Sequence, residues 1–406
     1  MAAFLRVLAI ATMAATFSVA CGRAPAPLSH DAYIWQRQWT PAVREALSGS
    51  TDLVRDWRVL VAQADRHGAF HTFAPDREAL ARSGRPVVLV VRIDGRLTSF
   101  DARVLADRIV ALTAGWPSAQ LAGIEIDYDC PTSRLPAYSD FLSTLRPRLG
   151  ALPLSITALP TWLGSRDLDA LLAIPDESVL QVHAVQAPQA GLFDPAVAAR
   201  WVDEFATYTR RPFRVALPTY GSRVSWNEDG SLLAVESERA ALAAGATSAE
   251  LYAAPETLMA FVAHLGTDRP RGLVGIVWFR LPTVDDTRAW SLATWRGVVR
   301  GQLDTRPLVI TLQPGETPDA PFDVMLANAA ATDAVPPRRV VLPSSCDVAD
   351  GIDGYRLHRV DNALELIADG ARPLKARTRR PIGWARCKAG TPLTLSPTSL
   401  QGTPVS

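Results

Sequence analysis

Short apolar runs alternate with stretches of helical period between residues 31 and 300. Eight of the runs are rich in β-branched and aromatic residues and end at turn-forming residues, which predicts β-strands. The predicted strands cover residues 32–36, 57–63, 86–93, 123–129, 153–159, 179–186, 213–220 and 273–279. Several of the stretches between them begin at Asp or Pro and stop at Gly, as helices do.

Eight strands that alternate with helices predict an α/β fold of the (β/α)8 TIM barrel class. An open, doubly wound sheet is the alternative. Such sheets usually carry a glycine-rich phosphate turn after an early strand, and neither GxGxxG nor GxxxxGK[ST] follows any predicted strand. The longest gap between strands, residues 221–272, has room for a small β insertion at about 221–255.

The pattern changes after residue 305, where short strand-like runs are separated by Pro, Gly and Asp. We therefore expect a small β-sandwich-like domain over residues 305–406, appended to a barrel over residues 21–304. Cys346 and Cys387 both lie in this segment and can form a disulfide in an oxidising compartment. Cys130 is expected to be a small buried hydrophobe rather than a nucleophile, because no histidine lies near it in the sequence.

The first 20 residues have the features of a signal peptide: Arg6, then an apolar run that is too short to span a bilayer, then small residues. The SVA-C sequence at 18–21 resembles the lipobox of bacterial lipoproteins, which implies lipidation at Cys21 and a lipid anchor in the membrane. Ser18 stands where that motif prefers Leu, so a plain export signal is the alternative. We expect a periplasm-facing lipoprotein, in the outer membrane, or a secreted protein.

Charge and composition exclude several classes of partner. Basic residues are scattered along a chain with a formal net charge of +1, so no nucleic-acid partner is expected. Six histidines without metal-ligand spacing, and no DxDxDG loop, predict no metal site. No cofactor is expected.

The strand at 121–130, LAGIEIDYDC, carries the candidate chemistry. Glu125, Asp127 and Asp129 occupy alternate positions, so they share one face of the strand. In a barrel this face points inward and towards the C-terminal mouth, where catalytic residues lie. Burial and mutual repulsion should raise the pKa of at least one carboxyl group, as a general acid requires. Structural pairing with arginines such as Arg92 is the alternative.

The segment AGIEIDYD at 122–129 resembles the D-G-x-D-x-D-x-E motif of the chitinase-like enzymes of glycoside hydrolase family 18. Residues 154–160, 216–221 and 275–279 resemble that family's fifth, seventh and eighth strands in the same order. The segments WQRQW at 35–39, GIEIDYDC at 123–130 and VLQVHAVQ at 179–186 also resemble an uncharacterised bacterial family of exported proteins, known as a domain of unknown function. That resemblance brings no established activity with it.

The resemblance implies a role for each matching residue. Asp129 would be the acid, Asp127 the orienting carboxylate and Glu125 a buried group that tunes their pKa values. Trp278 would form the floor of a sugar site and Tyr220 would contact the sugar. Apart from the resemblance, several residues end their strands near the same rim and are candidates for sugar contact, with packing as the alternative for each: Trp35, Gln36, Trp162, His183, Gln186 and Arg280.

Two departures from the family pattern affect the chemistry. Asp129 stands where the family has Glu, and Val185-Gln186 stands where it has Tyr-Asp.

The leading hypothesis is an exported glycoside-hydrolase-like enzyme that acts on an envelope or extracellular glycan by carboxylate acid/base chemistry. A non-catalytic glycan-binding lipoprotein is the second hypothesis. The third is an envelope assembly factor that acts through residues 305–406.

Overall fold

The computed structural model describes residues 27–97, 99–183, 192–229, 231–236, 247–317, 320–368, 372–388 and 390–395. The expected signal peptide, Cys21 and Gln186 lie outside these residues.

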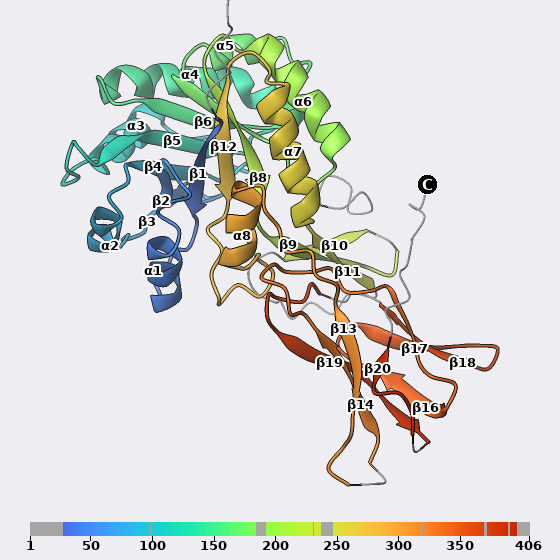
Figure 1. Cartoon of the computed structure of the whole chain (residues 1–406). Coiled ribbons are helices and arrows are strands. Elements are labelled where there is room, and N and C mark those ends of the chain that lie inside the picture. The colour runs from blue at the N-terminus through green and yellow to red at the C-terminus, as the bar shows by residue number, and fades with distance from the viewer. Residues whose placement is uncertain are drawn as a thin grey trace, which may run out of the picture.

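Eight parallel strands form a closed barrel (Figure 1). β1 pairs with β12 on one side and with β2 on the other, which closes the sheet and excludes the open alternative. The prediction of a TIM barrel is confirmed. The short strand β3 (Phe70–Thr72) is antiparallel to β2 at the edge. The barrel strands are β1 (Ser29–Ile34), β2 (Trp57–Ala64), β4 (Val87–Ile93), β5 (Leu121–Tyr128), β6 (Leu154–Ala158), β7 (Glu177–Gln181), β8 (Phe213–Pro218) and β12 (Leu273–Phe279).

Within the described residues, eight α-helices follow the strands and surround the barrel (Figure 1). Their starts agree with the local sequence, because side chains of Thr40, Asp76, Asp101, Asp194 and Ser291 accept hydrogen bonds from backbone N–H groups in the first helical turn. None of the helices described is long and apolar enough to cross a bilayer. The helices are α1 (Pro41–Ser48), α2 (Arg77–Arg82), α3 (Ala102–Ala111), α4 (Leu135–Leu145), α5 (Leu168–Leu172), α6 (Pro195–Tyr208), α7 (Pro255–Thr267) and α8 (Leu292–Val299).

Strand alternation divides the barrel into two apolar regions. The outward-facing residues of β5, Ile124, Ile126 and Tyr128, belong to the large core between strands and helices. A smaller cluster inside the barrel includes Tyr33 and Val277. The acids of β5 therefore face the barrel interior, as the two-residue period predicts.

A network of charged side chains fills the barrel interior near the N-terminal ends of the strands. Arg58 of β2 is 1% exposed and donates hydrogen bonds to the carboxylates of Asp31, Glu125 and Glu177. Arg214 of β8 bonds to Glu177 at 3.0 Å. Buried charges are tolerated when they are paired and hydrogen-bonded, so this network stands where many barrels have aliphatic layers.

The segment between β8 and α7 contains a three-stranded antiparallel sheet: β9 (Gly221–Trp226), β10 (Leu232–Glu236) and β11 (Thr247–Tyr252), with β9 in the centre. Gly221 connects this sheet to the barrel mouth. Its N–H donates to the Arg288 carbonyl oxygen at 2.8 Å. A Cβ atom at this position would lie 2.7 Å from the Leu251 carbonyl oxygen, so only glycine fits the close approach.

The C-terminal strands form two antiparallel sheets around a second apolar core, which includes Leu326, Leu366 and Ile382. A disulfide joins Cys346 and Cys387 on neighbouring strands. The five-stranded sheet has the order β16-β19-β14-β13-β20 and the three-stranded sheet the order β15-β18-β17. Their strands are β13 (Val309–Gln313), β14 (Phe322–Ala327), β15 (Arg339–Val341), β16 (Cys346–Gly351), β17 (Tyr355–Val360), β18 (Ala363–Ala368), β19 (Arg379–Cys387) and β20 (Thr394–Leu395).

Asp333 connects the C-terminal strands to the start of α8. Its carboxylate accepts from the Ser291 N–H at 2.7 Å and from the Ala376 N–H at 2.8 Å. Its own N–H donates to the Thr294 hydroxyl at 2.7 Å. Because Asp333 is 2% exposed, these hydrogen bonds fix the end of the β12–α8 loop against the C-terminal sheets.

Candidate functional site

The acidic strand β5 ends in a pocket of about 140 Å³ at the C-terminal mouth of the barrel. Side chains from seven of the eight barrel strands, or from the residues that follow them, converge there. A barrel brings together residues that are far apart in the sequence in this way, since each strand ends at the same rim. The lining residues are Tyr33, Trp35, Arg92, Asp127, Asp129, Thr157, Gln181, His183, Ala216, Tyr220 and Phe279.

Asp127 is buried in the pocket wall, with 4% of its surface exposed. Its Oδ1 accepts hydrogen bonds from the Thr157 hydroxyl at 2.8 Å and the Gln181 amide at 3.2 Å. Burial and the nearby Asp129 carboxylate raise the pKa of Asp127 to about 7, against the opposing effect of Arg92. The Arg92 guanidinium is 3.9 Å from Asp127, too far for a hydrogen bond, so structural pairing is weak here.

Asp129 follows the last residue of β5 and is exposed at the pocket rim. Limited hydration of its carboxyl group raises its pKa, Asp94 raises it further and Arg92 lowers it. Gly95 sets the position of this rim: a Cβ atom there would lie 2.2 Å from the Asp129 carbonyl oxygen.

Glu125 lies deeper in the barrel than Asp127 and does not line the pocket. Its carboxylate is bound by the Arg58 guanidinium, by the Tyr33 hydroxyl at 2.6 Å and by the Ser155 hydroxyl at 3.0 Å. Burial raises the pKa of Glu125, while these partners oppose the rise. Direct contact of Glu125 with a ligand is excluded by this arrangement. Its connection to the pocket runs through Tyr33, whose ring lines the pocket.

Aromatic side chains form the opposite wall. The Phe279 ring lies 5.0 Å from the Trp35 ring and 5.7 Å from the Tyr220 ring, in edge-on arrangements. His183 stacks on Phe279 with ring centroids 5.4 Å apart, and its Nδ1 is 3.5 Å from the Tyr220 hydroxyl. Burial lowers the pKa of His183 to about 4, so its imidazole is neutral near pH 7.

Two of the expected sugar contacts are corrected by the structure. Trp278 is completely buried between the barrel and its helices, and its indole N–H donates to His30 Nδ1 at 3.1 Å. Trp162 is also completely buried and donates to the Cys130 carbonyl oxygen at 2.9 Å. Neither side chain lines the pocket. In β12 it is Phe279, one residue further along, that faces the interior, because successive side chains point to opposite sides of a strand.

The pocket also contains residues that the sequence left unassigned. Thr157 and Gln181 are the hydrogen-bond donors to Asp127. Both are polar residues inside predicted apolar strands, which is a signal that could have identified them. Trp35 and Tyr220 also line the pocket. No group of three His, Cys, Asp or Glu side chains in the described part of the chain is arranged to hold a metal ion.

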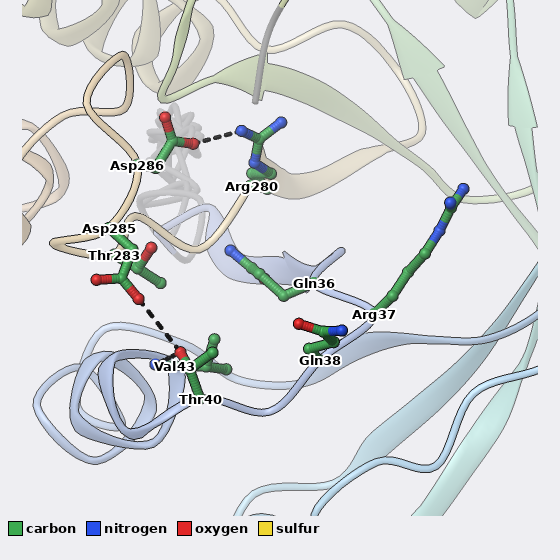
Figure 2. A pocket seen from close by; sticks show the side chains of 9 residues that line it. All are labelled: Gln36, Arg37, Gln38, Thr40, Val43, Arg280, Thr283, Asp285 and Asp286. Atoms are coloured by element: carbon green, nitrogen blue, oxygen red, sulfur yellow. Dashed lines mark hydrogen bonds and ion pairs between the residues drawn. The ribbon is translucent and has the colours of Figure 1, made fainter. Parts of the chain in front are cut away.

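A second pocket of about 400 Å³ lies between the loops that follow β1 and β12 (Figure 2). Trp35 and Phe279 line the first pocket, whereas their chain neighbours Gln36 and Arg280 line the second. Arg280 is ion-paired with Asp286 inside it. Its lining consists of Gln36, Arg37, Gln38, Thr40, Val43, Arg280, Thr283, Asp285 and Asp286.

Solved structures with a similar barrel include two chitinases and a spore enzyme. The spore cortex-lytic enzyme SleL from Bacillus cereus is 15% identical, with 68% of this chain and 75% of that chain covered and a TM-score of 0.48. A chitinase from Chromobacterium violaceum is 15% identical, with 68% and 98% covered and a TM-score of 0.47. A chitinase from Bacteroides thetaiotaomicron is 15% identical, with 63% and 90% covered and a TM-score of 0.48.

No curated protein matches the sequence of this chain. Two regions match protein families whose descriptions assign no activity. Residues 311–388, which contain most of the C-terminal strands, match a domain of unknown function (DUF8456). Residues 83–284, which contain β5, most of the barrel and the insertion, match another domain of unknown function (DUF3142).

Proposed function

We propose that this protein is a glycoside hydrolase that acts on a glycan at the mouth of its barrel. The observation that carries the proposal is the pair of carboxyl groups, Asp127 and Asp129, in one pocket with an aromatic wall. Two acids in one small site, one of them with a pKa raised to about 7, are the groups that cleavage of a glycosidic bond requires.

Each acid has a role that its surroundings support. Asp129 at the rim donates its proton to the leaving glycosidic oxygen, because its position is open to a ligand from solvent. Asp127 retains a proton up to near-neutral pH and is held by Thr157 and Gln181. It therefore orients the reacting sugar. A water molecule from solvent adds its hydroxyl to the anomeric carbon as the glycosidic bond breaks, and its remaining proton restores the Asp129 acid, so both carboxyl groups return to their starting state. Neutral His183 and Tyr220 supply polar contacts from the other wall.

The aromatic wall supports a sugar as the ligand. Sugar rings present apolar C–H faces together with hydroxyl groups, and amphipathic aromatic side chains suit such surfaces. Trp35, Phe279 and Tyr220 surround the cavity on one side, and the carboxyl and amide groups of β5 and β7 lie on the other. A glycan of the bacterial envelope or of the extracellular space would be the substrate of an exported protein.

Export and lipidation at Cys21 belong to the same proposal. The Cys346–Cys387 disulfide supports it, because disulfides persist mainly in oxidising compartments such as the periplasm. Labelled palmitate incorporated by the native chain and not by Cys21→Ser would support the anchor. Equal incorporation by both would contradict it.

Hydrolysis of a panel of β-linked oligosaccharides by the purified protein tests the proposed activity. Asp129→Asn and Asp127→Asn should each lower kcat by a factor of about 10² or more, which is the usual contribution of acid–base catalysis. Asp107→Asn is the matched control, because Asp107 is an acid on the outer helix α3. Equal rates in all four proteins, or no hydrolysis of any substrate, would refute the proposal.

A glycan-binding protein without catalysis is the second candidate. It is favoured by the side chain of Asp129, which is one methylene shorter than the Glu of the family it resembles, because a displacement of about 1 Å can cost on the order of a hundredfold in rate. In that case Asp129→Asn would leave glycan affinity unchanged and Phe279→Ala would lower it.

A further inference from the structure

We propose that Arg92 binds an anionic group of the ligand, so that the glycan recognised at the barrel mouth is an acidic one, with carboxylate or sulfate substituents. This proposal rests on the proposed function, and it adds the chemical class of the glycan. Arg92 belongs to β4 and lines the first pocket together with Asp127 and Asp129. Its side chain is 35% exposed, so a ligand in the pocket can reach the guanidinium.

The guanidinium of Arg92 has its hydrogen-bond donors free for a ligand. No described residue accepts a hydrogen bond from it, since its Nε lies 3.9 Å from Asp127 Oδ2, which is too far. The group lies over the Trp35 ring, 5.9 Å from the ring centroid. Stacking on an aromatic face leaves the five N–H donors available, because they lie in the guanidinium plane. Arg92 therefore presents a planar fork of donors at the pocket wall.

The arginines that neutralise acids deeper in the barrel have a different geometry. Arg214 donates to both carboxylate oxygens of Glu177 at 3.0 Å, and Arg58 donates to the same carboxylate at 2.5 Å. Asp127 instead receives its hydrogen bonds from neutral side chains. An arginine whose role was to hold Asp127 would form such bonds, so the position of Arg92 favours a partner outside the chain.

The charge of Arg92 is not cancelled by the acids around it. Asp94, in the turn after β4, is hydrogen-bonded by another arginine of its own turn. The pKa values of Asp127 and Asp129 are both raised, so each acid retains its proton to higher pH than an ordinary Asp and repels an anion less. His183 is neutral near pH 7. When both acids are protonated, Arg92 is the charged group among the lining residues.

An anionic sugar suits this arrangement better than a neutral one. Carboxylate and sulfate groups accept two parallel hydrogen bonds from a guanidinium, whereas a hydroxyl group does not need a cation as its partner. Arg92 lies opposite Asp127 in the register of β4 and β5, and Asp129 is two residues further along β5's path. The anionic group is therefore carried by the sugar ring beside the two acids.

The test compares matched acidic and neutral oligosaccharides. Isothermal titration would measure Kd for β-linked hexasaccharides of glucose and glucuronic acid, of mannose and mannuronic acid, and of chondroitin with and without sulfate. The native protein should bind the more acidic member of at least one pair about tenfold more tightly, which corresponds to about 1.4 kcal/mol. A preference in the first two pairs assigns the group as a carboxylate, and one in the chondroitin pair alone assigns it as a sulfate. Arg92→Gln should reduce the ratio to about one.

Arg66→Gln is the matched control, because Arg66 is exposed in the turn after β2, at the same end of the barrel, and does not line the pocket. This variant loses the same charge and should retain the tenfold ratio. Added NaCl should lower the ratio in the native protein, a measurement that needs no variant. Equal or tighter binding of the less acidic member of every pair, or a ratio that Arg92→Gln leaves intact, would overturn the proposal.

Hydrolysis measured on the same hexasaccharides separates this proposal from the proposed activity. Preferential binding of an acidic glycan without hydrolysis would support the role of Arg92 and contradict the enzyme. Hydrolysis with equal affinities within each pair would support the enzyme and contradict the role of Arg92. Absence of binding to every hexasaccharide would overturn both.

Discussion

Replacement of Trp278 by Ala should lower the free energy of unfolding. It should leave the affinity of the folded protein for its glycan ligand unchanged. The indole is completely buried, and removal of such a side chain costs about 3–5 kcal/mol of unfolding free energy. Loss of the indole N–H also leaves His30 Nδ1 without its 3.1 Å donor, which adds ~1 kcal/mol or more. Small domains have only about 5–15 kcal/mol in total, so most of the stability would be lost.

Phe279→Ala should cost less stability than Trp278→Ala and, unlike it, should weaken glycan binding. Phe279 is partly buried at the pocket, so its loss costs about 1–2 kcal/mol of stability. Loss of its ring from the aromatic wall should weaken glycan binding by roughly tenfold.

Urea unfolding followed by circular dichroism, together with titration calorimetry, measures both properties in each variant. Trp278→Phe retains most of the buried volume, so it provides a folded protein if Trp278→Ala does not fold, and it should bind glycan as the native protein does. A Trp278→Ala protein with native stability and no glycan binding would refute the assignment of the two aromatic residues.

Three further predictions concern pH, the disulfide and the C-terminal strands. The pKa of Asp127 rises from its ordinary 3.8 to about 7 on folding, so the native state binds more protons than the unfolded chain in that window. The unfolding free energy should therefore fall as pH increases from about 4 to 7, and Asp127→Asn should flatten this dependence in urea titrations at several pH values. Joint replacement of Cys346 and Cys387 by Ser opens a loop with a sequence separation of 41 residues, which should cost about 4 kcal/mol in the C-terminal transition measured by calorimetry. Asp333→Ala leaves the Ser291 N–H without its acceptor, so it should lower the unfolding free energy measured in urea by about 1–3 kcal/mol. Asp347→Ala is the control and should change the unfolding free energy little, because the Asp347 side chain is exposed on β16. A flat pH dependence in the native protein, unchanged calorimetry in the Ser variant, or equal effects of the two Asp variants would contradict the respective predictions.

The barrel and the acidic strand could be predicted from sequence because both depend on local periodicity. Eight apolar runs with helical stretches between them specify a (β/α)8 order, and alternation in residues 121–130 specifies which face carries the acids. The same rule places Asp127 and Asp129 at the mouth, since strand β5 ends at Tyr128.

The remainder of the site depends on contacts between distant strands. The apolar run at 273–279 does not show whether Trp278 or Phe279 faces inward, because a one-residue shift exchanges the two faces. Glu125 could not be separated from the other acids without knowledge of its partner Arg58, which is 67 positions away in the sequence. Thr157 and Gln181 belong to the site only because β6 lies beside β5, and β7 beside β6, in the barrel.

A crystal structure of the Asp129→Asn protein with a bound oligosaccharide tests the central claim most directly, because that substitution should stop turnover while the pocket is retained. We predict a sugar ring against Trp35, Tyr220 and Phe279, with a glycosidic oxygen within hydrogen-bond distance of residue 129. An oligosaccharide bound away from this pocket, or no bound sugar at concentrations at which the native protein binds it, would contradict the assignment of Asp127 and Asp129 to glycan chemistry.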